Sequence, residues 1–102
     1  MKYTRSYYAS NGTTAIEMWS DIGEPWATVT VNLEDYGMIP EDENHIYIPV
    51  YKLNVDLVEQ IKKDLVEEVV RREYIGYNGD CEVLYARLKP NWKEICEGYD
   101  YG

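Results

Sequence analysis

The chain has 102 residues, of which 45% are hydrophobic and 14% aromatic, so we expect one domain over residues 1–102 and exclude a disordered chain. Its net charge of −9 argues against direct binding to nucleic acid or to an anionic membrane, because both depend on Lys and Arg. The chain has no apolar run long enough to span a bilayer and no cationic, apolar leader at its start, so a cytoplasmic location is expected.

The first predicted element is a β-hairpin around the pair Asn11-Gly12. Runs rich in β-branched and aromatic residues lie on both sides of this pair. Asn-Gly favours a two-residue type I′ turn, in which both residues have positive φ. Such a turn pairs Ser10 with Thr13.

A turn over residues 20–25 is followed by a predicted strand over 26–33, where apolar and polar residues alternate with a period of two. Residues 34–44 are expected to form a polar, acid-rich loop. A short strand is predicted over 45–50. Pro49 belongs at its edge or its end, because proline has no N–H donor.

The only long helix is predicted from about residue 55 to residue 73. Asn54 is its expected N-cap, and apolar side chains recur at helical spacing along it. We expect this helix to cover one face of the sheet. The residues predicted to pack together there are Val29, Val31, Ile61, Leu65 and Val69.

Turn residues around Asn78-Gly79 predict a change of direction, and a strand follows over 81–89. A helical turn is expected within 91–97, and the tail from about 98 is expected to be mobile. The order β-β-β-(β)-α-β indicates an α+β fold. It combines an antiparallel sheet of four to five strands with one long helix packed on one face.

Part of the sequence resembles a small uncharacterised domain family encoded on bacterial mobile elements, namely phages, plasmids and conjugative transposons. The resemblance rests on Asn11-Gly12 before Ala15-Ile16, and on the block Gly23 to Leu33. The stretch from Ile46 to Leu53 is also similar to a strand of that family. The resemblance implies a mobile-element setting and supplies no catalytic residue.

The sequence carries no motif typical of catalysis, a metal or a cofactor. His45 is the only histidine and has no sequence context that would orient it as a base. Cys81 and Cys96 lack the ligand number and spacing of a zinc site and are expected to be reduced thiols. The acids at 41–43 lack the alternating ligands of a calcium loop. We therefore expect a protein that is not an enzyme and uses no metal or cofactor.

Acidic residues are concentrated in one part of the chain. Between Ser6 and Tyr51 there are eight acids and no Lys or Arg. Carboxylates on alternate residues of a strand lie about 7 Å apart, which is comparable to the phosphate spacing of a nucleic-acid strand. A rigid acidic surface of this kind can imitate a nucleic-acid backbone and steer a basic partner toward itself.

These observations favour a non-enzymatic inhibitor from a mobile element that binds a basic, nucleic-acid-binding protein of the host, such as a defence nuclease, and blocks its nucleic-acid site. Anti-CRISPR and antirestriction proteins act in this way. The alternative is a small protein–protein interaction adaptor with no nucleic-acid link. Acids clustered on one face favour the inhibitor, and dispersed acids favour the adaptor. The predicted partner-binding residues, with the two tyrosines as exposed anchors, are Glu17, Asp21, Glu24, Glu34, Asp35, Tyr36, Glu41, Asp42, Glu43 and Tyr47.

Overall fold

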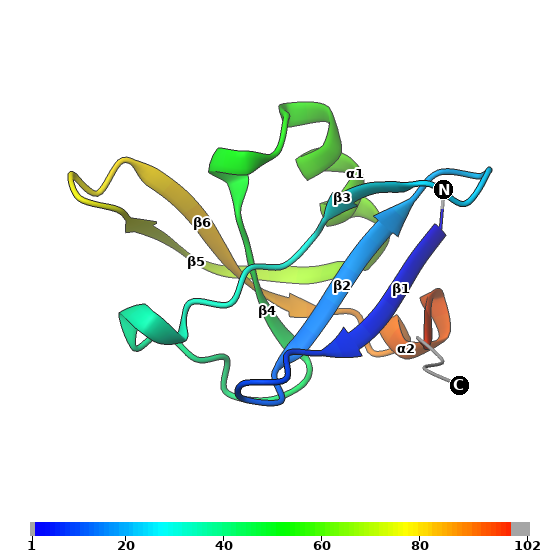
Figure 1. Ribbon diagram of the computed structural model, residues 1–102, viewed down its shortest axis with the longest axis horizontal. Helices are drawn as coiled ribbons and strands as arrows, with labels where there is room; N and C mark the ends of the chain where they lie inside the picture. Colours follow the sequence, from blue (N-terminus) through cyan, green and yellow to red (C-terminus); the bar gives the residue numbers. More distant parts are fainter. Residues whose placement is uncertain (1, 99–102) are drawn as a thin grey trace.

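The computed structural model describes residues 2–98, which fold into two sheets with short helices between and beside them (Figure 1). The elements are β1 (Lys2–Tyr7), β2 (Thr14–Trp19), β3 (Pro25–Thr28), the 3₁₀ helix η1 (Glu34–Tyr36), β4 (His45–Ile48), the 3₁₀ helix η2 (Val50–Lys52), α1 (Val55–Leu65), β5 (Val66–Ile75), β6 (Cys81–Leu88), α2 (Trp92–Ile95) and β7 (Cys96–Gly98). Within these residues, one sheet has the strand order β3-β2-β1-β7 and the other the order β4-β6-β5. The α+β class is therefore confirmed.

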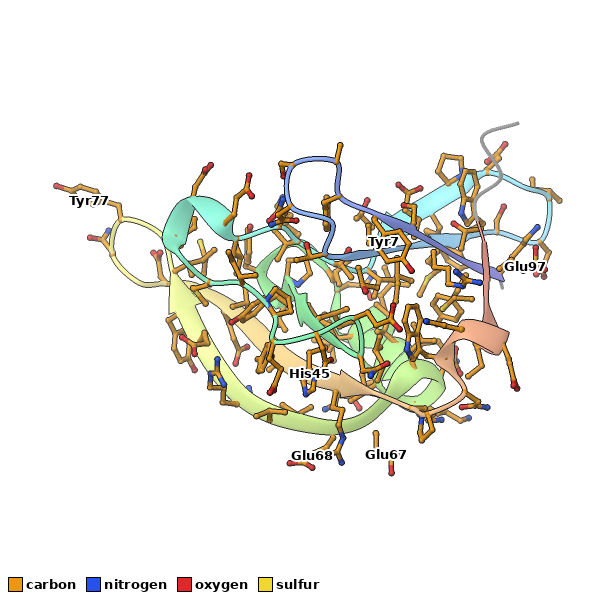
Figure 2. The ribbon with its side chains drawn as sticks, turned by 90° about the horizontal axis from the view of Figure 1, so that it is seen from below. Tyr7, His45, Glu67, Glu68, Tyr77 and Glu97 are labelled. Atoms are coloured by element: carbon orange, nitrogen blue, oxygen red, sulfur yellow. The ribbon has the colours of Figure 1, made fainter. Side chains whose placement is uncertain are left out.

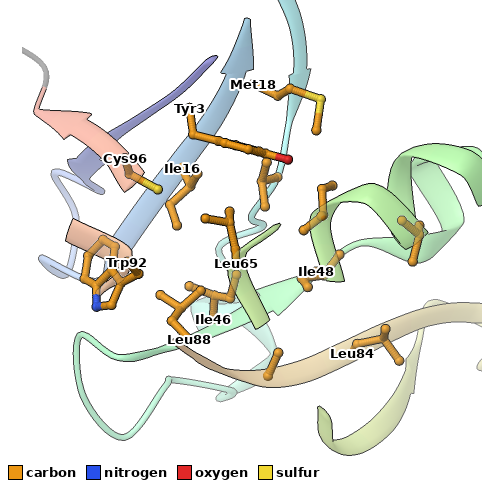
Figure 3. Close-up of a cluster of buried hydrophobic side chains, with 14 residues drawn as sticks. Tyr3, Ile16, Met18, Ile46, Ile48, Leu65, Leu84, Leu88, Trp92 and Cys96 are labelled. Atoms are coloured by element: carbon orange, nitrogen blue, oxygen red, sulfur yellow. The ribbon is translucent and has the colours of Figure 1, made fainter. Parts of the chain in front are cut away.

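The larger of two hydrophobic clusters fills the space between the two sheets, and α1 and α2 complete its walls (Figure 3). Leu65, at the end of α1, has no exposed surface and lies between side chains of both sheets. Trp92 on α2 is 1% exposed and closes the cluster at one end, and α2 itself is the helical turn predicted within 91–97. The fully enclosed members of the cluster include Ile16, Met18, Val29, Ile48, Ile61, Leu65 and Cys96.

The central strand β6 is buried on both faces and separates the two clusters. Its residues Leu84, Ala86 and Leu88 enter the larger cluster, whereas Val83 and Tyr85 enter the smaller one. This alternation confirms the predicted strand over 81–89. Strand β4, which pairs with β6, confirms the predicted strand that begins at residue 45, and Pro49 follows its last residue.

The predicted long helix is wrong in its second half. Asn54 caps α1 as expected, because its Oδ1 accepts a hydrogen bond from the Leu57 N–H at 2.8 Å. However, α1 ends at Leu65, and the chain passes directly into β5, which pairs with β6. The structure thus has two sheets beside a short helix, and the expected arrangement of a long helix over one sheet is not found.

Two β-bulges in β5 explain why this strand has the periodicity of a helix. The pairs Val66 with Leu88 and Val69 with Ala86 advance three residues along β5 but only two along β6. Each bulge inserts one extra residue into the bulged strand. The apolar residues Val66 and Val69 therefore both face the larger cluster at a separation of three residues, which is close to the helical spacing. Val69 packs against the larger cluster as expected, but from a strand.

The first hairpin is confirmed, but its turn is longer than predicted. Tyr7 pairs with Thr14, and the Tyr8 N–H donates to the Thr13 carbonyl at 2.9 Å, so the turn spans four residues. Gly12 has φ +71°, whereas Asn11 has negative φ, which rules out a type I′ turn. The Asn11 side chain is the reason: its Oδ1 accepts from the Thr13 N–H and hydroxyl, and this bonding shapes a wider loop.

The predicted strand over 26–33 is shorter and leaves its sheet. Strand β3 ends at Thr28, and the chain then crosses from one sheet to the other. The Val29 N–H donates to Ile16 of β2, whereas the Val31 N–H donates to Tyr47 of β4. Val29 accordingly joins the larger cluster and Val31 packs against the smaller one, so the predicted common core of these two residues is wrong.

The end of the described chain adds a strand that the sequence did not predict. Strand β7 pairs in parallel with β1, with Tyr3 opposite Cys96. The mobile tail expected from about residue 98 falls, apart from Gly98 in β7, outside the described residues.

Candidate protein-binding surface

The acid-rich segment from the start of η1 to the residue before β4, residues 34–44, is called the acidic loop here. Its first half is a tight turn: the Gly37 and Met38 N–H groups donate to Glu34 and Leu33, and Gly37 has φ +71°. Leu33 is 3% exposed and anchors this turn in the smaller cluster. Tyr36 at the end of η1 remains 57% exposed, in agreement with its predicted role as an exposed anchor.

His45 fixes the second half of the acidic loop. Its Nδ1 lies 2.7 Å from Asp42 Oδ1, and its Nε2 lies 3.1 Å from Glu41 Oε1. Each ring nitrogen thus faces one carboxylate oxygen, so the imidazole joins Glu41 to Asp42. The bond from His45, together with the Asn44 N–H, lowers the pKa of the Asp42 carboxyl below its usual value. His45 thus holds the second half of the loop in place, and the sequence did not predict this role.

Aromatic rings on the sheet β4-β6-β5 pack beside His45 and contact the loop. The Tyr85 hydroxyl accepts a hydrogen bond from the Glu41 N–H at 2.9 Å, and its ring stacks on His45 with centroids 5.3 Å apart. On the other side the Tyr85 ring lies 4.7 Å from the Tyr47 ring and 4.3 Å from the Arg71 guanidinium. Tyr47 is therefore only 3% exposed, and its predicted role as an exposed anchor is wrong.

The last residues of the loop are bonded to two further elements, β2 and α2. The Glu43 carboxylate pairs with Lys93, and the Glu43 carbonyl accepts a hydrogen bond from the Thr14 hydroxyl at 2.8 Å. The Asn44 side chain accepts from the Trp92 indole N–H at 3.0 Å. These bonds join the end of the loop to β2 and α2 and fix the positions of Glu43 and Asn44.

The predicted acidic site residues do not form one patch. Glu34 and Asp35 lie on η1, whereas Asp21 and Glu24 lie in the turn between β2 and β3, at the opposite end of the molecule (Figure 1). Glu17 is half-buried on β2. Within the described residues, neither Glu34 nor Asp35 forms an ion pair, in contrast to the three carboxylates at 41–43.

One exposed apolar residue of the acidic loop was not predicted. Ile39 is 56% exposed and follows Tyr36 by three residues along the same loop. The sequence could have indicated it, because Ile39 is an aliphatic residue between Gly37 and Pro40 in a largely polar segment. The loop therefore offers two exposed apolar side chains beside unpaired carboxylates.

The described residues offer little reactive chemistry. Among residues 2–98 no three His, Cys, Asp or Glu side chains converge to hold a metal ion. Each nitrogen of His45 already faces a carboxylate oxygen, which leaves neither as a free acceptor for a substrate proton. Burial raises the pKa of the Cys96 thiol to about 12, so little of it is the reactive thiolate.

The sequence matches no protein-family model, and neither a curated protein nor a solved structure is significantly similar to it. The resemblance to a mobile-element family therefore stays a prediction. No helix in the described part of the chain has the length and apolar character needed to cross a membrane.

Proposed function

We propose that this protein is a non-enzymatic inhibitor, carried by a mobile element, that binds a basic nucleic-acid-binding protein of the host and blocks its nucleic-acid site. Its action is of the anti-CRISPR or antirestriction type, and the acidic loop is the contact surface. The protein itself does not bind nucleic acid, because the net charge of −9 repels a phosphate backbone.

The observation that carries this proposal is the rigid acidic loop with exposed apolar side chains on it. Tyr36 and Ile39 are each more than half exposed, and the carboxylates of Glu34 and Asp35 lie beside them without ion pairs in the described structure. Tyrosine is enriched among residues that dominate binding energy. Unpaired carboxylates attract a basic partner over a distance that depends on the salt concentration.

The rigidity of the loop favours binding rather than mere solubility. A partner that docks on a loop already held by His45, Tyr85 and Lys93 has little conformational entropy to remove from it. Acids that serve only for solubility need no such anchoring. The surface so defined is smaller than the sequence predicted, because Asp21 and Glu24 lie at the other end of the molecule (Figure 1).

The second candidate is an adaptor that joins proteins without any nucleic-acid link. The dispersal of the acidic residues over two ends of the molecule favours it, since a mimic of a long backbone would present them in one row. The two candidates differ in the partner they require: the inhibitor needs a basic nucleic-acid-binding protein, and the adaptor does not.

Affinity capture from host lysate with matched variants tests the proposal. The loop variant Glu34→Gln/Asp35→Asn removes two charges at the proposed surface. The control Glu24→Gln/Glu67→Gln removes two exposed charges elsewhere; Glu67 points outward from β5 (Figure 2). The residues at 41–43 are unsuitable probes because they hold the loop in place.

We expect the parent protein and the control variant to capture the same nucleic-acid-binding protein, identified by mass spectrometry, and the loop variant to lose it. Tyr36→Ala should weaken capture as well. If the loop variant captures as much partner as the control, the acidic loop is not the contact surface. If the captured protein binds no nucleic acid, the adaptor replaces the inhibitor.

A further inference from the structure

We propose that a groove beside β3 is a second binding site, which takes an extended segment of a partner protein that carries an acidic side chain. The groove has a volume of about 610 Å³, within the range of about 300–1,000 Å³ that is typical of ligand pockets. One wall is the chain from Trp26 to Asn32, and the other is formed by η2 and the start of α1. No residue of the acidic loop lines the groove, although its lining residue Asn32 accepts a hydrogen bond from the Glu34 N–H at the start of that loop. The inference goes beyond the proposed function.

The backbone along the first wall is suited to pair with another strand. In the described structure β3 is an edge of its sheet, with β2 on one side only. The N–H groups of Val29 and Val31 point inward, to β2 and β4 respectively. Successive residues of a strand direct these groups to opposite sides, so the N–H of Thr28, the exposed last residue of β3, points outward. Thr30 beyond it is only 3% exposed, and its hydroxyl accepts a hydrogen bond from the Ile16 N–H.

The outward N–H group of Thr28 has no backbone partner in the described part of the fold. Outside the β2–β3 ladder, no backbone–backbone hydrogen bond of the described residues involves Thr28. Thr28 is exposed and lines the groove. An extended peptide that lies in the groove adds a strand at this edge, and its main-chain hydrogen bonds supply affinity without dependence on its sequence.

Charge identifies the chemistry of the occupant. Lys52 is the only charged residue that lines the groove, although the chain as a whole carries −9. Lys52 is exposed, and it forms no ion pair within residues 2–98; its ammonium group lies 5.6 Å from the Tyr51 ring centroid. Most other Lys and Arg residues of the described chain pair with a carboxylate. An Asp or Glu of the occupant completes the pairing of Lys52.

The groove also has an apolar surface that an adjacent side chain of the occupant can contact. Trp26 is 55% exposed, and together with Leu53 and Leu57 it lines the groove. Side chains of a bound strand alternate between its two faces, so one face of the occupant meets this apolar surface. The occupant we propose is therefore a short extended segment with one acidic residue and at least one apolar residue.

Selection from a phage-displayed library of random peptides, about eight residues long, tests this inference. We expect the selected peptides to share an acidic residue and to protect the Thr28 amide from hydrogen exchange when bound. Lys52→Glu should weaken binding of a selected synthetic peptide by roughly 10- to 100-fold, the effect of losing a charged hydrogen bond. Lys63→Glu, which changes an exposed lysine on α1 outside the groove, should leave binding unchanged.

A second variant tests the main-chain pairing separately. Thr28→Pro removes an N–H that points away from β2, a position where an edge strand tolerates proline. We expect it to weaken binding of the same peptide, with the melting curve showing that the variant folds. The inference is wrong if the selected peptides lack acids and bind Lys52→Glu as tightly as the parent. It is also wrong if exchange protection falls on the acidic loop, or if sedimentation shows that a second copy of the chain occupies the β3 edge.

Discussion

Removal of the Leu65 side chain tests the central packing of the two sheets. Leu65 has no exposed surface, and its neighbours come from β2, β4 and β6 as well as from α1 (Figure 3). These neighbours are held by separate sheets and cannot move together to fill the space. Leu65→Ala therefore leaves a cavity, and we expect a loss of about 3–5 kcal/mol, the upper part of the range for buried Leu→Ala changes. Such a loss is a large share of a typical stability of about 5–15 kcal/mol.

Urea denaturation followed by circular dichroism measures this loss directly. The midpoint should fall while the slope stays near that of the parent, because the folded state remains compact. The melting temperature should drop by more than about 12 °C, since 1 kcal/mol corresponds to roughly 4–8 °C for a chain of this size. Val70→Ala, on a residue that is 40% exposed in β5, is the control and should cost less than about 1 kcal/mol. If Leu65→Ala costs no more than this control, Leu65 does not lie between the sheets.

Three further predictions concern single residues. Gly12→Val should cost about 1 kcal/mol or more, because φ is +71° there, and Gly12→Asn should cost less; equal midpoints in urea would contradict the turn. The hydrogen bond from His45 lowers the pKa of Asp42 in the folded protein below its unfolded value of about 3.9. This bond therefore stabilises the fold at pH values above about 3.9, and the stabilisation is lost as the pH falls through the folded pKa. In Asp42→Asn the free energy of unfolding should accordingly fall less steeply as the pH is lowered. If it falls as steeply as in the parent, the pair of Asp42 and His45 contributes nothing to stability. In a thiol-reagent titration, half-buried Cys81 should react in the native protein and Cys96 only after unfolding; reaction of both at one rate would contradict the burial of Cys96.

The parts of the fold that could be predicted are those whose signals are local. The N-cap at Asn54 and the alternation along β6 depend on a few neighbouring residues, and both are present. The helix prediction fails from Val66 onward for a physical reason, because a bulge places the apolar residues Val66 and Val69 three positions apart on the core side of β5. Only the partner strand β6 decides between helix and strand there, and a sequence pattern does not contain that long-range pairing.

The candidate site was predicted in composition but not in arrangement. The segment from residue 34 to 44 is the exposed acidic loop that its composition indicated, and Tyr36 is exposed on it. Tyr47 is buried because β4 lies inside the molecule, where its ring meets Tyr85 and Arg71. The pairing of Glu43 with Lys93 joins residues 50 positions apart, so the sequence could not show that part of the acidic charge is neutralised.

A competition titration with the captured partner tests most directly whether the acidic loop occupies a nucleic-acid site. Labelled nucleic acid bound to the purified partner is titrated with this protein at about 0.1 M and about 1 M salt, where the Debye length falls from about 10 Å to about 3 Å. We predict complete displacement of the nucleic acid, weaker displacement at high salt, and a further loss with Glu34→Gln/Asp35→Asn. If the partner binds both molecules at once and salt has no effect, the proposed inhibition is contradicted and the protein is an adaptor.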